Sequence, residues 1–289
     1  MNHKRSLVKI IFCSLAFSVT ITATAQNKNE EKNKLSVNPG QKFQVDNTVK
    51  TVSSMEMMGQ QMDMSADIIA VRLFEVKDKK ESNYKVASTI TKLIASANAM
   101  GQAMSYDSEK KEDTASELSK ALKDKINVPV EMEMNDEGKV VSAKKDTAAN
   151  NKQGMGDMLG SIGADETAIT DDLFLLVPKN IKVGDTWSDS VITDGLKTYR
   201  DYTVKSLQGN DATLTLSGKQ VMNKIMENMG MEMTMTMDSK LTGEIVVDTK
   251  SSIIKQRSLT ADGTGSMDVM GQSVPMTTKV ETTSTAKSL

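Results

Sequence analysis

The sequence of 289 residues contains a single cysteine, Cys13, and a single histidine, His3. Beyond residue 25 the chain therefore has neither the thiol nor the imidazole that enzymes use most often as nucleophile and general base. It also lacks a glycine-rich phosphate loop, a nucleophile elbow and a metal-binding pair of histidines. These absences argue against catalysis. We expect a protein that is not an enzyme, uses no cofactor and has no metal site.

Basic runs and clusters of aromatic with basic side chains are also missing. Without its first 25 residues the chain loses three basic residues, which leaves 36 − 3 = 33 Lys and Arg against 38 Asp and Glu, a net charge of −5. We therefore expect no nucleic-acid partner. Because that part of the chain has no cysteine, a disulfide framework is excluded, and the hydrophobic core alone must stabilise the fold.

Residues 1–25 have the pattern of a secretory signal peptide: basic residues, an apolar run from Ile10 to about Val19, and Ala23-Thr24-Ala25 as cleavage site. The apolar run is too short to span a bilayer, so we expect no transmembrane segment in the mature chain. Cys13 follows Phe12, whereas a lipoprotein signal needs a small residue there. The prediction is a secreted protein, periplasmic or extracellular. The polar residues 26–40 are predicted to form a disordered leader.

Methionine, by contrast, is abundant, with 22 residues. Residues 231–237 alternate strictly between methionine and a polar residue, which is the period of a β-strand and places the thioethers on one face. Similar patterns occur at Met55-Glu56-Met57, Met62-Asp63-Met64 and Met132-Glu133-Met134. The carboxylates between the methionines are expected on the opposite, solvated face.

Four Met-Gly pairs that are followed by Gln or Met are candidate two-residue hairpin turns, because glycine supplies the positive φ that such turns require. A turn at Met58-Gly59 predicts that the following residues face each other: Met57 and Gln60, Met55 and Met62, Ser53 and Met64, Val49 and Ile68, Val45 and Arg72, Phe43 and Phe74. A turn at Met229-Gly230 predicts Met226 with Met233, Met222 with Met237, Leu214 with Ile245, and Ala212 with Val247. The turns at 270–271 and 100–101 predict Met267 with Val274 and Ala97 with Met104. The predicted hairpins are unusually long.

Further turn signals, spaced by about ten to fifteen residues, are typical of an antiparallel meander. The fold class is mainly β (α+β), a long curved antiparallel sheet or open half-barrel with a short helical insertion. A capping box at Thr114–Glu117 predicts a helix ending near Lys125. Residues 41–289 are predicted to form a single domain. The similarity of Val183-Gly184-Asp185-Thr186-Trp187 to Pro39-Gly40-Gln41-Lys42-Phe43 suggests two related halves, 41–145 and 183–285, joined by a helical or flap insertion, 146–182.

Several motifs together resemble a family of secreted bacterial proteins of unknown function that is common in Bacteroidota. They are the Met-rich hairpins, residues 183–187, and the segments Tyr202–Ser206, Leu241–Asp248 and Ser273–Thr277. The resemblance covers about residues 40–284 and brings no catalytic residues with it. It implies export and a curved antiparallel sheet. More loosely, the pattern is similar to the half-barrels of periplasmic lipoprotein carriers, whose concave face holds acyl chains.

The most direct hypothesis is a non-catalytic binding protein for an apolar ligand, a lipid or a lipoprotein acyl chain. Methionine side chains are flexible and polarisable, so a surface made of them adapts to ligands of varied shape. The predicted ligand-binding residues are Met55, Met57, Met62, Met64, Met132, Met134, Met222, Met226, Met233, Met235 and Met237. Three alternatives remain open. The methionines form a core covered by helices from residues 112–125 and 150–177, they bind Cu(I), or the sheet is a structural or partner-binding element.

Overall fold

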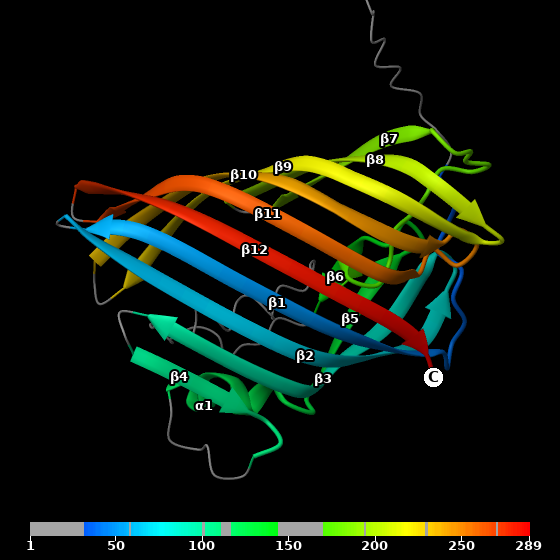
Figure 1. Ribbon diagram of the computed structural model, residues 1–289. Helices are drawn as coiled ribbons and strands as arrows, with labels where there is room; N and C mark the ends of the chain where they lie inside the picture. The colour runs from blue at the N-terminus through cyan, green and yellow to red at the C-terminus, as the bar shows by residue number, and fades with distance from the viewer. Residues whose placement is uncertain are drawn as a thin grey trace, which may run out of the picture. The chain divides into compact units, whose positions relative to one another are not determined.

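The computed structural model describes residues 32–57, 59–99, 102–110, 117–143, 170–193, 195–228, 231–269 and 271–289. These residues form twelve strands and one short helical region (Figure 1). The elements are β1 (Lys42–Met57), β2 (Gln60–Lys80), β3 (Asn83–Ala99), β4 (Gln102–Asp107), α1 (Glu117–Leu122), η1 (Lys123–Lys125), β5 (Pro129–Asn135), β6 (Val140–Ala143), β7 (Thr186–Thr193), β8 (Leu196–Gln208), β9 (Asp211–Asn228), β10 (Met231–Asp248), β11 (Ile254–Val269) and β12 (Gln272–Ser288).

All twelve strands belong to one sheet, in the order β6-β5-β3-β2-β1-β12-β11-β10-β9-β8-β7, with β4 paired to β3. Every pair of neighbouring strands is antiparallel. The first and last strands of the chain's sheet region, β1 and β12, lie side by side in the middle (Figure 1). The sheet is open, and the prediction of one large antiparallel sheet is confirmed.

The hairpin registers agree with the sequence at every predicted pair. Strands β1 and β2 pair Phe43 with Phe74 and Met55 with Met62. Strands β9 and β10 have eighteen residues each. They pair Ala212 with Val247 near one end and Met226 with Met233 near the other. The pairs Met267 with Val274 and Ala97 with Met104 are also present. Gly59 and Gly271 have φ values of 75° and 80°, as the turn chemistry requires.

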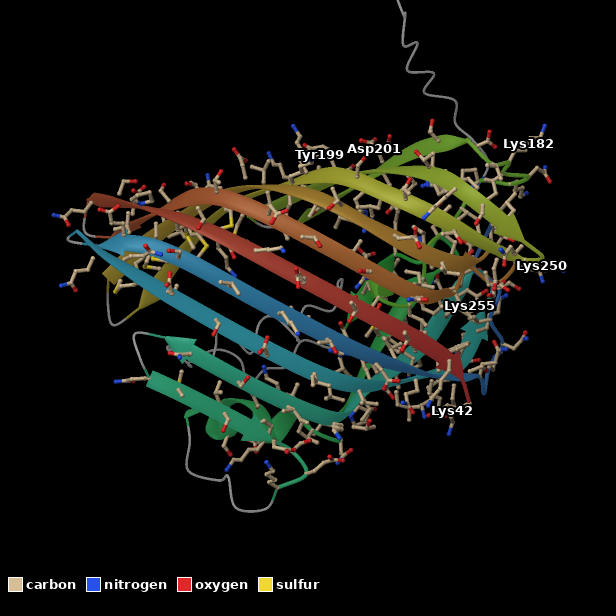
Figure 2. The ribbon with its side chains drawn as sticks, in the orientation of Figure 1. Lys42, Lys182, Tyr199, Asp201, Lys250 and Lys255 are labelled. Carbon is tan, nitrogen blue, oxygen red and sulfur yellow. The ribbon has the colours of Figure 1, made fainter. Side chains whose placement is uncertain are left out.

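The two faces of the sheet differ in character. We call the face that bears Phe43, Phe74 and Tyr202 the inner face, because these side chains are almost fully buried. The other, outer face is polar, and Figure 2 shows Tyr199 and Asp201 of β8 standing on it. Tyr199 is 40% exposed, whereas Tyr202, which points to the inner face, is 1% exposed. This alternation is the direct result of the two-residue period of a strand.

Two segments outside the strands cover one end of the inner face. Residues 173–177 contribute Leu173, Phe174, Leu175 and Val177, which contact the inner-face residues of both halves of the sheet. Backbone hydrogen bonds fix this segment to the turn between β10 and β11, from Leu175 to Ser252 and from Ile254 to Leu173. The end of the sheet near Phe43 therefore has a closed hydrophobic core.

The second covering segment corrects a prediction. Residues 32–40 were expected to be part of a disordered leader, but Leu35 and Val37 are 3% and 1% exposed. Tyr84 donates a hydrogen bond of 2.7 Å to the Leu35 carbonyl, and Asn33 N–H donates to Val177. The composition is polar, yet the two apolar side chains alternate and bury themselves against the sheet. The prediction of disorder is wrong for this segment, and residues 1–31 lie outside the described part.

We expect Leu35→Ala to lower the free energy of unfolding by about 2–5 kcal/mol, because it deletes a fully packed side chain. Urea denaturation followed by circular dichroism measures the loss. Lys34→Ala is the matched control, since the neighbouring Lys34 side chain is 75% exposed and its ion pair with Asp136 contributes little. A loss below about 1 kcal/mol for Leu35→Ala would show that the segment is not docked.

The predicted helix after the capping box is present in part, as α1 followed by η1. Leu118 and Leu122 of α1 are buried against Ile68, Leu93 and Ala95 of the inner face. The capping residue Thr114 and most of the predicted insertion, residues 146–182, lie outside the described residues. The helical character of that insertion stays a prediction.

Candidate functional site

The methionines of the long hairpins meet on the inner face at the end opposite to the Phe43 core. Register partners follow one another across six strands from β2 to β9: Met62, Met55, Met276, Gly265, Met237 and Met222. Directly opposed side chains have Cβ atoms roughly 5 Å apart, so the thioethers on adjacent strands contact each other, and Gly265 separates Met276 from Met237. We name the group the methionine surface. It comprises Met55, Met62, Met64, Met222, Met235, Met237, Met267, Val274 and Met276.

The methionine surface is only partly covered. Met55, Met237, Val274 and Met276 are 6–8% exposed, and they form the centre of the cluster. The members around them are half-buried. Burying a methionine side chain fully stabilises the folded protein by roughly 1.5–3 kcal/mol. The half-buried members therefore keep apolar area that a ligand or a covering segment could bury.

Two predicted site residues lie elsewhere. Met132 and Met134 of β5 are 2% and 0% exposed and pack with Tyr84 and Phe174. The reason is register: β5 pairs with the beginning of β3, where Met134 faces Tyr84. This position is near Phe74 and Phe43, and twelve residues of β1, about 40 Å of strand, separate Phe43 from Met55. Met132 and Met134 therefore do not belong to the methionine surface, which corrects the prediction that grouped them with the other methionines.

The remaining predicted residues are accounted for individually. Met233 is half-buried and faces Met226 and Val269 in the next row of the sheet. The side chains of Met57 and Met226 lie outside the described part of the structure. Three residues of the methionine surface were not predicted as site residues, Met267, Val274 and Met276. The turn at 270–271 already paired Met267 with Val274, so this signal was present in the sequence.

The carboxylates that alternate with the methionines behave as expected. Glu56, Asp63 and Glu133 are exposed on the outer face. Within the described residues there is no group of three or more His, Cys, Asp or Glu side chains that could hold a metal ion. No helix in that same part of the chain is long and apolar enough to cross a membrane.

A second feature of the inner face was not predicted: a cluster of buried ion pairs. Arginine occurs only four times in the sequence, and Arg72, Arg200 and Arg257 all belong to this cluster. Arg257, 8% exposed, binds the Asp172 carboxylate and donates to the Asp171 carbonyl at 3.0 Å. Arg200 binds Asp171 at 3.0 Å and Asp189 through two hydrogen bonds of 2.7 and 3.1 Å. Asn47 donates to Asp172 at 3.1 Å.

Burial and charge act on this cluster in opposite directions. Burial lowers the pKa of Arg72, and the negative charge of Asp172 partly offsets the effect. Burial would also lower the pKa of Arg200, but the surrounding acidic groups outweigh it and raise that pKa. Burial raises the pKa of Tyr202, which keeps its hydroxyl protonated as a donor to Asp189 at 3.2 Å. Burial likewise raises the pKa of Asp171, and the positive charges of Arg200 and Arg257 oppose that rise.

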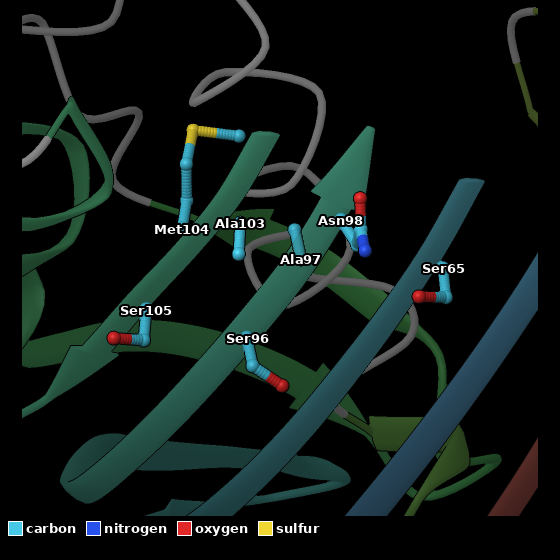
Figure 3. Close-up of a pocket in the computed structure, with 7 residues that line it drawn as sticks. All are labelled: Ser65, Ser96, Ala97, Asn98, Ala103, Met104 and Ser105. Atoms are coloured by element: carbon cyan, nitrogen blue, oxygen red, sulfur yellow. The ribbon is translucent and has the colours of Figure 1, made fainter. Parts of the chain in front are cut away.

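A shallow pocket of about 270 Å³ lies on the strands β2, β3 and β4 (Figure 3). Its lining is Ser65, Ser96, Ala97, Asn98, Ala103, Met104 and Ser105. The serines and the asparagine are exposed on the outer face, and small side chains rather than a built cavity create the depression. Apolar ligands need a mostly apolar lining, so we do not assign the ligand site to this pocket.

The fold and its inner face define a class: an open, single-sheet, mainly-β protein with a methionine surface at one end of the inner face and buried ion pairs near the other. The chain belongs to a family of unknown function, DUF6263, whose model matches residues 81–254. No functionally curated protein matches the sequence. The matched residues include Met222, Met237 and Arg200, and the whole of β3 to β10.

Among solved structures, a structure described as lipid–protein interactions in lipovitellin is similar with a TM-score of 0.50 and 12% sequence identity. The match covers 87% of this chain and 25% of lipovitellin, so the chain spans a quarter of that protein's length. An outer membrane channel from Pseudomonas putida F1 matches with a TM-score of 0.25 and 7% identity, over 90% of this chain and 100% of the channel. At 12% sequence identity, the match to lipovitellin shows similarity of fold and nothing more.

Proposed function

We propose that this protein is an exported, non-catalytic binding protein for an apolar ligand, such as a lipid or an acyl chain. The observation that supports the proposal is the row of five methionines and Gly265 across six strands, bordered by methionines that are only half-buried. Such flexible side chains adapt to ligands of different shape. The sheet resembles part of lipovitellin, whose structure is described in terms of lipid–protein interactions, and the proposal agrees with that likeness.

Native mass spectrometry of the protein purified from its own cell envelope, followed by organic extraction, tests this function. The expected result is a lipophilic adduct in a fixed ratio to protein, identified in the extract. The proposal is overturned if the protein has its bare mass and also fails to take up a fluorescent fatty-acid probe.

One observation favours a second candidate function, Cu(I) binding. Met62, Met55 and Met276 are direct neighbours on three adjacent strands, which brings three thioether sulfurs together at one place. Thioethers are soft ligands that select Cu(I). The full row is longer than a single copper ion needs, and the half-buried methionines on β10 and β11 have no role in this alternative. Lipid binding therefore remains the first proposal.

The double variant Met55→Leu/Met276→Leu distinguishes the two candidates. Leucine and methionine have similar volumes, so the exchange is expected to cost less than about 1.5 kcal/mol in stability and to preserve uptake of the fatty-acid probe. Cu(I) affinity, measured by competition with a chromophoric chelator, would be lost if the sulfurs were ligands. Met104→Leu, in a different cluster of the inner face, is the matched control for both measurements.

A further inference from the structure

The three arginines lie on the inner face of the sheet, where burying a charge is unfavourable unless it is paired. The outer face and the turns use lysine throughout, whereas Arg72, Arg200 and Arg257 are the only arginines beyond Arg5, and they all extend toward the inner face. Arginine presents a planar fork of donors that matches a carboxylate or a phosphate in two-point contact. The inner face therefore carries a site built for oxyanions.

In this structure the chain's own carboxylates occupy the site. Asp171 and Asp172 do not come from the sheet. They lie just before residues 173–177, in the segment 170–178 that we call the covering segment, and they bind Arg200 and Arg257. The three arginines and the three aspartates Asp171, Asp172 and Asp189 balance in formal charge. A further anion is accommodated only in exchange for a carboxylate of the covering segment. Asp171 is the accessible one, since its side chain is 39% exposed.

Buried polar atoms without a partner mark the same place. Arg257 Nε, Ser284 Oγ and Asn47 Oδ1 are buried and make no hydrogen bond within the described residues. The three residues are register partners in one row across β1, β12 and β11. Unsatisfied buried groups are rare in native proteins, and these three belong to the row whose Asn47 and Arg257 side chains bind Asp172.

The path from this site to the methionine surface runs along the inner face of β11. Between Arg257 and Gly265 lie Leu259, Ala261 and Gly263, and Leu259 and Ala261 are half-buried. Eight residues of strand span about 26 Å. One leaflet of a bilayer's hydrocarbon core is roughly 15 Å deep, with its chains not fully extended. An acyl chain that starts at Arg257 and is more extended than in a bilayer would run along Leu259 and Ala261 toward the methionine surface.

Building on the proposed apolar-ligand function, we propose that the arginine cluster binds the anionic head group of an amphiphile, a carboxylate or a phosphate, in place of the covering segment's aspartates. The acyl tail lies along β11 toward the methionine surface. The aspartates thus act as an internal competitor, and the ligand class narrows from any apolar molecule to single-headed anionic lipids.

Titration calorimetry with oleate, oleyl phosphate and oleyl alcohol, each below its aggregation concentration, tests the inference on the intact protein. At least one of the two anionic compounds is expected to bind about tenfold or more tightly than the alcohol, which corresponds to one charge-assisted contact pair. The anion that binds more tightly identifies the head group as carboxylate or phosphate. Asp171→Asn is expected to strengthen binding of that anion by about tenfold and to leave the alcohol unchanged.

Asp201→Asn is the matched control, because it removes the same charge from the outer face of β8, next to Arg200, and is expected to change neither affinity. Thermal unfolding of each variant is recorded alongside. Equal affinities of the wild type for all three compounds would overturn the head-group inference and leave the apolar-ligand function standing. Equal effects of Asp171→Asn on anion and alcohol would overturn it as well. Binding of none of the three would overturn both proposals.

Discussion

Arg257→Met is expected to lower the free energy of unfolding by about 3–5 kcal/mol, because it breaks a buried ion pair and leaves its partner charged. The Arg257 side chain is 10% exposed and that of Asp172 16%. Without Arg257, the Asp172 carboxylate keeps a hydrogen bond from Asn47 and the more distant charge of Arg72. The Asp171 carbonyl loses its donor too. Urea denaturation at neutral pH measures the change.

A double-mutant cycle separates the pair from its surroundings. Adding Asp172→Leu to Arg257→Met removes the carboxylate that has lost its partner. The double variant is therefore expected to lose less free energy of unfolding than the two single variants lose together. The exposed pair Lys205–Glu244 provides the control, and Lys205→Met is expected to change stability by less than about 1 kcal/mol. Additive losses at Arg257 and Asp172 would contradict the direct interaction.

The hairpin registers were predictable because the turn chemistry and the side-chain period act together. Once Gly59 supplies the positive φ, every facing pair in the hairpin is determined, and the apolar pairs from Met55–Met62 to Phe43–Phe74 agree with one placement of the turn. A slip by one residue would turn all of these side chains to the solvent. Local physics is sufficient here, even for strands of sixteen to twenty-one residues.

The grouping of methionines was predictable only within each hairpin. Strand β5 pairs with β3 across an intervening segment of more than twenty residues, so no turn fixes its register in advance. Met132 and Met134 have the same local pattern as Met62 and Met64 but pack at the opposite end of the inner face. Alternation gives the face of a strand, whereas position along the sheet depends on long-range pairing.

The ion-pair cluster depends on contacts that are distant in sequence. The hairpin rule did place Arg72 opposite Val45, which is an inner-face position, and this was a usable signal of a buried charge. Its partners come from Asp171 and Asp172, at the end of a segment without a periodic pattern, and Arg257 is 85 residues away from Asp172. The rarity of arginine in a lysine-rich sequence is the feature that would have pointed to the cluster.

Gly265→Ala is expected to destabilise the protein by about 3 kcal/mol or more, because the new methyl group meets backbone that cannot move independently. A Cβ atom at this position would overlap the carbonyl oxygen of Thr236 and lie 2.8 Å from the Cα of Met237 on the neighbouring strand. Gly265 stands between Met276 and Met237 in the methionine row. Its missing side chain lets β10 and β11 approach closely and lets those two thioethers contact each other.

Gly263→Ala, two residues earlier on the same face of β11, is the matched comparison. There the added methyl group meets side-chain atoms alone, with Ser239 Oγ at 2.6 Å and both Met237 Sδ and Thr278 Cγ2 at 2.9 Å. The loss in free energy of unfolding is expected to be smaller than for Gly265→Ala, since side-chain rotation rather than a backbone shift relieves the overlap. The alanine also reduces the entropy of the unfolded chain, which offsets about 0.4–1 kcal/mol of the loss. Thermal and urea unfolding of both variants give the order. If Gly263→Ala costs as much as Gly265→Ala, steric exclusion by the backbone of β10 is not what requires glycine at 265, and the close contact between Met276 and Met237 needs another cause.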